Sequence, residues 1–125
     1  WKKDANGQYT RFQYDVDDNI SQLKYTNSNG NPLNPSTSPI SFDYDVNYNR
    51  LVKVTDDIGW TEYRYVPHND YGAGKISWIG SSFQGSTAQF SYDVMGQLIS
   101  RNIRKGLIDF YQHSWKYDPL GMINE

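Results

Sequence analysis

The sequence predicts an all-β protein in which consecutive antiparallel β-hairpins form one strongly twisted sheet. The first observation is a motif of an aromatic residue, a spacer and a tyrosine, which occurs five times in 125 residues, with its tyrosines at 14, 44, 65, 92 and 117. The second is that a polar turn and an aliphatic residue follow each copy, the aliphatics being Ile20, Leu51, Ile76, Leu98 and Ile123. Recurrence at this interval indicates a repeat array, in which each unit packs against the next.

Composition supports strands and excludes several functional classes. Aromatic residues make up 16% of the chain and eleven of them are tyrosines, a usage that suits pleated, half-buried surfaces. The net charge of −2 is spread without a basic stripe, so we expect no nucleic-acid partner. The chain contains no cysteine, and no apolar run approaches the ~20 residues of a membrane-spanning helix. We therefore expect no disulfide and no membrane span.

Residues 88–103 show how one repeat is expected to fold. Apolar and polar residues alternate up to Tyr92, which places Phe90 and Tyr92 on one face of a strand. Asp93 can then accept hydrogen bonds from the backbone two residues on, and Gly96 can take the positive φ that such a turn needs. Leu98 begins the return strand, so the unit is a hairpin.

The remaining repeats follow the same scheme, with variations in the turn. In the first, after Tyr14 and Asp15, we expect Asp18 in the left-handed position, since aspartate tolerates that geometry. The last repeat offers the same series with glycine: Tyr117, Asp118 and Gly121. The second, after Tyr44 and Asp45, is one residue longer, with Asn49 as the left-handed residue, and the third, after Tyr65, has a larger loop over residues 66–75.

Several return strands carry a second aliphatic residue three positions after the first, as at Ile20 and Leu23. That spacing is out of phase with strict alternation and predicts a β-bulge. Polar, glycine-containing links separate the hairpins, and residues 31–39 form a proline-rich excursion. It is too short to be a domain linker. We expect residues 1–125 to be a single array of about five hairpin repeats, a fragment of a longer repeat region with no helix.

These motifs resemble the RHS or YD-repeat family, whose unit runs tyrosine-aspartate, two variable positions, glycine, arginine, leucine. The segment Tyr92-Asp93-Val94-Met95-Gly96-Gln97-Leu98 is similar nearly throughout, with glutamine replacing the arginine, and residues 117–123 are similar with Met122 there. The Asn49-Arg50-Leu51 variant and the Gly72-Ala73-Gly74-Lys75 loop are similar to forms in large bacterial members. The resemblance covers residues 9–125, although Tyr65-Val66 departs from the pattern.

The resemblance implies a segment of a spiralling β-shell. In bacterial members such shells enclose a C-terminal toxin or effector, so the implied partners are neighbouring repeats and that enclosed segment, and the implied location is secreted or at the bacterial cell surface. Open edges predict that the chain alone aggregates or dimerises. The alternative is a repeat module that binds carbohydrate or a surface protein.

We expect no enzymatic activity, no cofactor and no metal. His68 and His113 are far apart in sequence and belong to no zinc motif. Residues 15–19 resemble the start of a calcium loop but lack its glycine and distal glutamate, so turn formation explains them better. The self-cleaving aspartates of toxin-type family members have no matching stretch here.

Three aromatic residues lie outside the repeating register: Trp60, Tyr71 and Trp78. They could form a sugar-stacking patch, because planar rings present flat apolar faces. The alternative is that they cover a neighbouring layer or line the inside of a shell. If they gather on one exposed face, the binding module is favoured.

Overall fold

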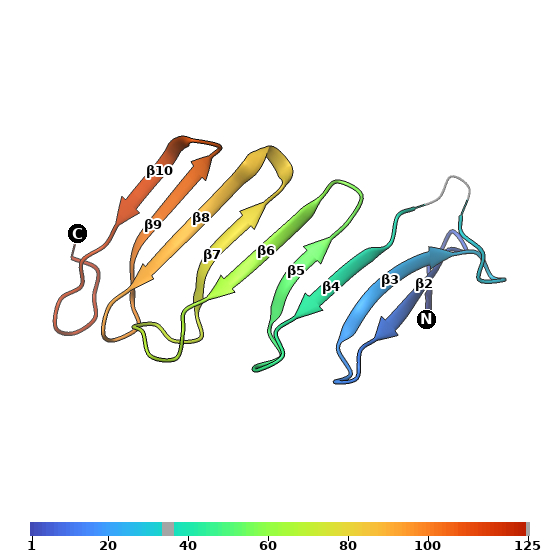
Figure 1. Ribbon diagram of the computed structural model, residues 1–125, viewed down its shortest axis with the longest axis horizontal. Helices are drawn as coiled ribbons and strands as arrows, with labels where there is room; N and C mark the ends of the chain where they lie inside the picture. Colours follow the sequence, from blue (N-terminus) through green and yellow to red (C-terminus); the bar gives the residue numbers. More distant parts are fainter. Residues whose placement is uncertain (34–36, 125) are drawn as a thin grey trace. The chain divides into compact units, whose positions relative to one another are not determined.

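In the computed structural model, the described residues are 1–33 and 37–124. Over these ranges the chain forms ten β-strands and one 3₁₀ turn, with no α-helix (Figure 1). The chain divides into two compact units, Trp1–Trp60 and Thr61–Glu125. The prediction of an all-β chain of consecutive antiparallel hairpins is confirmed. Of the proline-rich excursion, residues 34–36 lie outside the described residues.

The first unit is a run of antiparallel strands paired in chain order. The expected hairpins over Tyr14 and Tyr44 form here, each with its tyrosine at the end of the first strand and its aliphatic residue at the start of the second. The strands are β1 (Lys2–Lys3), β2 (Tyr9–Tyr14), β3 (Ile20–Thr26), β4 (Ile40–Tyr44) and β5 (Leu51–Thr55).

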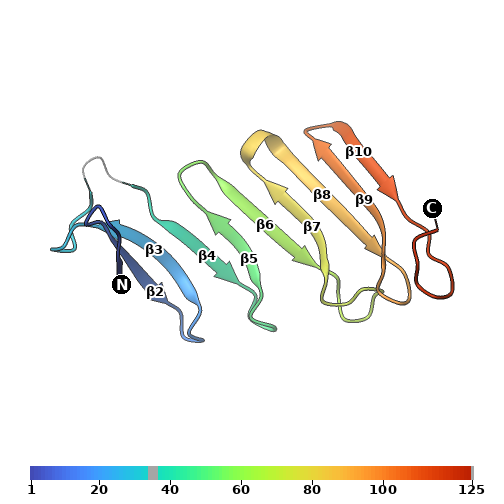
Figure 2. The ribbon, with the colours of Figure 1, turned by 180° about the vertical axis from the view of Figure 1, so that it is seen from behind.

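The second unit repeats the arrangement and is seen from behind in Figure 2. Its strands pair antiparallel in chain order, and β10 ends the series by pairing with β9. A 3₁₀ turn, Phe83–Gly85, joins the second strand to the third. The strands are β6 (Trp60–Tyr65), whose first residue belongs to the first unit, β7 (Ile76–Ser81), β8 (Ser86–Tyr92), β9 (Leu98–Lys105) and β10 (Ile108–Ser114).

A β-bulge follows the first residue of the return strands β3, β5, β7 and β9, and the aliphatic spacing predicted it in the first three. Tyr14 lies opposite Ile20 whereas Gln13 lies opposite Gln22, so Ser21 is the extra residue. The same shift recurs at Tyr44, Tyr65 and Tyr92. The bulge has a packing consequence. It lets two aliphatic residues three apart face the same side as the aromatic and the tyrosine of the opposing strand.

Each unit therefore has two chemically different faces. We call the face that carries the motif tyrosines the tyrosine face, and its partner the opposite face. Among the described residues only Val66, 8% exposed, Thr26, 6% exposed, and Gly80 are buried, while the motif aromatics Phe12, Phe42 and Phe90 are half-buried. Such a thin core is expected of a single sheet layer, whose stability depends on contacts between successive hairpins.

Candidate functional site: the contacts between successive hairpins

The aspartate of the tyrosine-aspartate motif builds the turn from within. Oδ1 of Asp93 accepts hydrogen bonds from the backbone N–H groups of Met95 at 2.9 Å and Gln97 at 2.8 Å. The backbone closes the same turn, because Asp93 N–H donates to the Gln97 carbonyl and Gly96 N–H to the Asp93 carbonyl. Gly96 takes a φ of 75°. One carboxylate thus satisfies two donors that the turn would leave unpaired.

The first and last motifs form the same turn. Asp15 accepts from the N–H groups of residues 17 and 19, and Asp118 from those of residues 120 and 122. The left-handed residues fall where the sequence predicted them, with φ of 62° at Asp18 and 80° at Gly121. The side chain of Asn19 adds a further hydrogen bond to Asp15. Turn formation therefore accounts for residues 15–19.

Two further copies of this turn occur. The sequence predicted a turn over residues 27–30 but not its likeness to the motif turns, and it did not predict the turn at Asp4. Asp4 accepts from the N–H groups of Asn6 and Gln8, and Asn27 accepts from those of Asn29 and Asn31. Both turns place a glycine with positive φ at their fourth position, Gly7 and Gly30. The signal was present as aspartate or asparagine followed by glycine three positions on. It was overlooked because neither copy follows a tyrosine.

The longer turn of the second repeat uses an ion pair. Asn49 is left-handed with a φ of 57°, as predicted, and Nε of Arg50 lies 2.7 Å from Oδ2 of Asp45. Desolvation raises the pKa of Asp45, but hydrogen bonds from Arg50 and from the Tyr48 N–H, together with the arginine charge, outweigh it, so its pKa lies below the ordinary value. Desolvation likewise opposes ionisation of Asp15, and hydrogen bonds from Asn19 and Asp17 lower its pKa overall.

The motif tyrosines connect each hairpin to the one before it. The hydroxyl of Tyr92 donates to the backbone carbonyl of Ile76 at 2.7 Å, and that of Tyr44 to the carbonyl of Ile20 at 3.0 Å. Tyr117 repeats the contact on Leu98 at 2.8 Å. In each case the acceptor is the aliphatic residue that begins the preceding return strand. Burial raises the pKa of Tyr92 above its ordinary value.

Tyr14 and Tyr65 complete the set of motif tyrosines. Tyr14 belongs to the first motif hairpin and is 57% exposed. Tyr65 is half-buried and lies opposite Ile76 in its own hairpin. Val66, which replaces the aspartate there, exchanges backbone hydrogen bonds with Lys75 and Gly74 across the base of the larger loop. The loop is therefore closed by backbone groups alone at the position where other repeats use a carboxylate.

A second set of contacts runs from each turn to the next. The residue just before the aliphatic residue that begins each return strand forms a hydrogen bond with the left-handed residue of the next turn. Nζ of Lys75 donates to the Gly96 carbonyl at 2.7 Å, and Nε2 of Gln97 approaches the Gly121 carbonyl at 3.5 Å. In the first unit, the side-chain amides of Asn19 and Asn49 exchange hydrogen bonds. This is the position at which the repeat unit that these motifs resemble has arginine.

The loop of the third repeat, residues 66–75, also packs against the tyrosine of the fourth repeat, Tyr92. Gly72 has a φ of +81°, and a Cβ there would lie 2.5 Å from Cγ of Tyr92. Nζ of Lys75 lies 5.5 Å from the centre of the same ring. The loop backbone therefore sits directly on the Tyr92 ring. Only glycine combines that close approach with that conformation.

The out-of-register aromatics are not gathered into one patch. Trp78 lies on the opposite face, paired with Arg64, whose guanidinium is 4.3 Å from its ring centre, and its ring covers Gly80. Tyr71 is an exposed loop residue that lines a shallow hollow with Phe90 and Tyr92. Trp60 belongs to the first unit, where Lys53 approaches its ring. Within the second unit, Tyr71 and Trp78 thus lie in different places.

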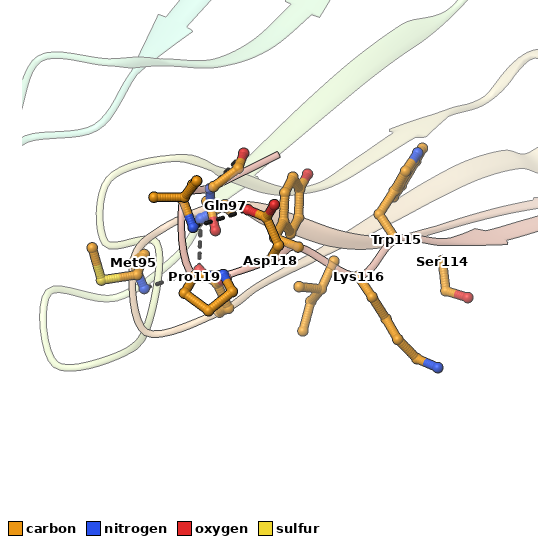
Figure 3. Close-up of a pocket in the computed structure, with 12 residues that line it drawn as sticks. Met95, Gln97, Ser114, Trp115, Lys116, Asp118 and Pro119 are labelled. Atoms are coloured by element: carbon orange, nitrogen blue, oxygen red, sulfur yellow. Dashed lines mark hydrogen bonds between the residues drawn. The ribbon is translucent and has the colours of Figure 1, made fainter. Parts of the chain in front are cut away.

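An open hollow of about 980 Å³ lies beside the last two turns. Figure 3 shows Gln97, Asp118 and Pro119 together at one end, with Trp115 extending to the side away from Ser114 and Lys116. Its carboxylates, Asp93 and Asp118, already accept backbone N–H groups of their own turns. The hollow therefore offers little ready chemistry to a ligand.

Over the described ranges, no group of three or more histidine, cysteine or acidic side chains could hold a metal ion. Within the same ranges, no helix is long and apolar enough to cross a membrane. In comparisons with known proteins, no protein-family model and no curated protein matches the sequence. The repeated contacts between hairpins are the candidate functional feature of the chain.

Proposed function

We propose that this chain is a structural segment of RHS or YD-repeat type, forming part of the wall of an encapsulating β-shell. The shell would belong to a large exported or cell-surface protein and would enclose a C-terminal toxin or effector segment. The observation that carries the proposal is the two-way contact between successive hairpins. A tyrosine hydroxyl donates a hydrogen bond to the preceding repeat. The side chain just before the aliphatic residue of the return strand donates a hydrogen bond to the next turn.

These contacts suit a wall because they specify how hairpins add. Each new hairpin supplies a hydroxyl donor for a carbonyl left by the last one and offers a turn carbonyl to a side chain of that hairpin. The rule can be repeated without limit and fixes the register at each step. Such a sheet acts by geometry, keeping an enclosed peptide from solvent and proteases. The motif carboxylates are engaged in turns, which fits a structural role for them.

The alternative, a module that binds carbohydrate or a surface protein, called for Trp60, Tyr71 and Trp78 to share an exposed face. Within the second unit, Trp78 lies on the opposite face under Arg64, whereas Tyr71 lies in the loop beside Tyr92. These positions do not favour the three-ring patch, so the wall is the better proposal.

The reactivity of single introduced cysteines tests the proposed wall function directly, because the chain has no native cysteine. Ser86 and Ser91 on β8 lie on the tyrosine face and the opposite face, respectively. We expect that, in the intact polypeptide containing this chain, cysteine at one of the two positions reacts with a bulky maleimide and cysteine at the other does so only after denaturation. In the isolated chain both should react. Equal reaction of the two positions in the intact protein would contradict the proposal.

A further inference from the structure

Two of the contacts between turns, both in the second unit, place a long side chain against a glycine. Nζ of Lys75 donates to the Gly96 carbonyl at 2.7 Å, and Nε2 of Gln97 approaches the Gly121 carbonyl at 3.5 Å. Both glycines are left-handed, with φ of 75° and 80°. Lysine and glutamine thus share what the contact uses, namely an N–H donor at the end of a long, flexible side chain.

The space above each of these glycines is filled by the side chain that arrives from the earlier turn. A Cβ on Gly96 would lie 3.7 Å from both Cε and Nζ of Lys75, and a Cβ on Gly121 would lie 3.0 Å from Nε2 of Gln97. At Gly106, which is also left-handed, a Cβ would meet nothing within 4 Å. The crowding therefore does not come from the left-handed conformation itself. A side chain on either glycine would leave less room for the incoming donor.

The first unit makes the equivalent contact with two short side chains. The left-handed residue of its second motif turn is Asn49, with a φ of 57°, and the residue that meets it is Asn19. Nδ2 of Asn19 donates to Oδ1 of Asn49 at 2.5 Å, and Nδ2 of Asn49 donates to Oδ1 of Asn19 at 3.3 Å. Each amide supplies one donor and one acceptor. A left-handed residue that carries a side chain is thus met by a short partner.

We infer that these two positions form a size-matched pair that selects which hairpin can follow which. The first position is the residue just before the aliphatic residue of a return strand, and the second is the left-handed residue of the next turn. A long donor such as Lys75 requires glycine in the following hairpin, whereas Asn19 accepts asparagine. In the mixed combinations, a short side chain does not reach the carbonyl, or a long one meets a side chain in its place.

This inference deepens the proposed wall function and rests on it, because a rule of succession matters where non-identical hairpins have to add in a fixed order. The partner that it names is a neighbouring hairpin with a turn of matching size. The register of a sheet is set by its side-chain pattern and its turns, and the matched pair adds a contact from one turn to the next. The strength of the pairing itself is measurable in the chain alone.

A simpler account is that long, exposed side chains lie over whatever turn is near. Nζ of Lys75 also lies 5.5 Å from the centre of the Tyr92 ring, so the ring by itself could hold the lysine in place. On that account a substitution at residue 96 would not change what Lys75 contributes to stability, and the two effects would add. Size matching predicts instead that the effects of the two positions depend on each other.

A double-mutant cycle on the 125-residue chain decides between these accounts. Its members are the parent, Lys75→Asn, Gly96→Asn and the double variant, with the equilibrium constant of unfolding measured by urea denaturation. We expect each single variant to raise this constant. The double variant should unfold about threefold to tenfold less readily than the product of the two single effects, the range of one recovered hydrogen bond. Purely multiplicative effects would overturn the inference.

Gly106→Asn is the matched control, because it places asparagine in a left-handed position of the same unit where nothing is close. Its effect should be independent of Lys75→Asn. In the parent chain, Gly96→Asn should be more damaging than Gly106→Asn, and in the Lys75→Asn background the two should be alike. A dependence on Lys75 that is as large for Gly106→Asn as for Gly96→Asn would show that no matched pair exists.

The length of the donor is tested without any change at the glycine. Lys75→Gln and Lys75→Asn both replace the ammonium group with an amide, and they differ by one methylene group. Since Gln97 already approaches a glycine carbonyl at its own turn, Lys75→Gln should leave the unfolding constant nearly unchanged and Lys75→Asn should raise it. Equal losses in the two variants would assign the contact to the charge of Lys75 and overturn the inference.

Failure of this inference can be told apart from failure of the wall function. Independent effects in the cycle would leave the expected cysteine reactivity at Ser86 and Ser91 of the intact polypeptide untouched. Equal cysteine reactivity at those two positions, in turn, would remove the wall but not a measured dependence between residues 75 and 96. The two experiments therefore report on different claims.

Discussion

The hydroxyl of Tyr92 donates to the backbone carbonyl of Ile76 at 2.7 Å, across two successive hairpins. Sixteen residues separate the donor from the acceptor, and the equivalent contacts of Tyr44 and Tyr117 span 24 and 19. The tyrosine is therefore not only a half-buried ring of its own strand. It also satisfies a main-chain acceptor of the preceding repeat and so fixes the position of one hairpin on another.

Replacing Tyr92 with phenylalanine should weaken the fold by the value of this contact. Tyr92→Phe keeps the ring but leaves the Ile76 carbonyl without its donor, so we expect a loss of about 0.5–1.5 kcal/mol in the free energy of unfolding. Urea denaturation followed by circular dichroism measures it. The control is Tyr14→Phe, at a tyrosine that is 57% exposed, where we expect almost no change. Equal effects at both positions would contradict a specific inter-repeat role.

The contact of Gly72 with the Tyr92 ring predicts that alanine substitutions at Gly72 and at Gly74 destabilise the fold unequally. Gly72 and Gly74 have φ of +81° and +79°, so alanine is strained by a similar amount at either. At Gly74, however, a Cβ would meet nothing within 4 Å, whereas at Gly72 it would collide with the Tyr92 ring. We expect Gly72→Ala to lower the free energy of unfolding by at least about 1 kcal/mol more than Gly74→Ala. Matching thermal unfolding curves for the two variants would show that the ring moves aside freely.

The turn aspartates should tolerate asparagine but not alanine. Asp93 accepts two backbone N–H groups through one oxygen, and Asn27 makes the same pair of contacts with an amide oxygen. We therefore expect Asp93→Asn to be nearly neutral and Asp93→Ala to cost about 1 kcal/mol, as for the loss of a helix N-cap. Chemical denaturation of the two variants decides the point. If Asp93→Asn were as damaging as Asp93→Ala, charge and not hydrogen-bond acceptance would be the requirement.

Stability should fall at acid pH through two carboxylates in particular. The pKa values of Asp15 and Asp45 are lower in the folded chain than their ordinary value of 3.8. The unfolded state then binds protons more readily, so the stabilisation is present above about pH 4 and is lost as pH falls through the folded pKa. We expect Asp45→Asn to reduce the fall in the free energy of unfolding as pH is lowered into this range. A fall of unchanged steepness would show that other groups cause it.

The free β10 edge should also govern association of the isolated chain. We expect concentration-dependent self-association by light scattering, because the strand is exposed along its length, includes Ile108 and Phe110 and carries one charged residue. Phe110→Lys should reduce it by placing charge on the edge, whereas Val16→Lys, at an equally exposed apolar residue of a turn, should not. A parent chain that stayed monomeric at high concentration would argue against an open edge.

Local features of the fold were predictable because their causes are local. The left-handed residues Asp18, Asn49, Gly96 and Gly121 lie where turn chemistry placed them. The bulges of β3, β5 and β7 follow from aliphatic spacing, since one extra residue is the simplest way to bring two residues such as Ile20 and Leu23 to one face. The turn at Asn27 was predicted only as a link between hairpins and that at Asp4 was not predicted, although both follow the same rule without a preceding tyrosine.

The sequence by itself determined the hairpins, their turns and their bulges, because each depends on residues within a few positions of one another. Only the tertiary structure decided which carbonyl receives each tyrosine hydroxyl, that Gly72 lies on Tyr92, and that Trp78 and Tyr71 are separated. It also revealed that Arg101, and not an aliphatic residue, lies opposite Phe90 and beside the Tyr111 ring. Those relationships join residues of different strands, and their geometry is fixed by strand pairing, which no local pattern specifies.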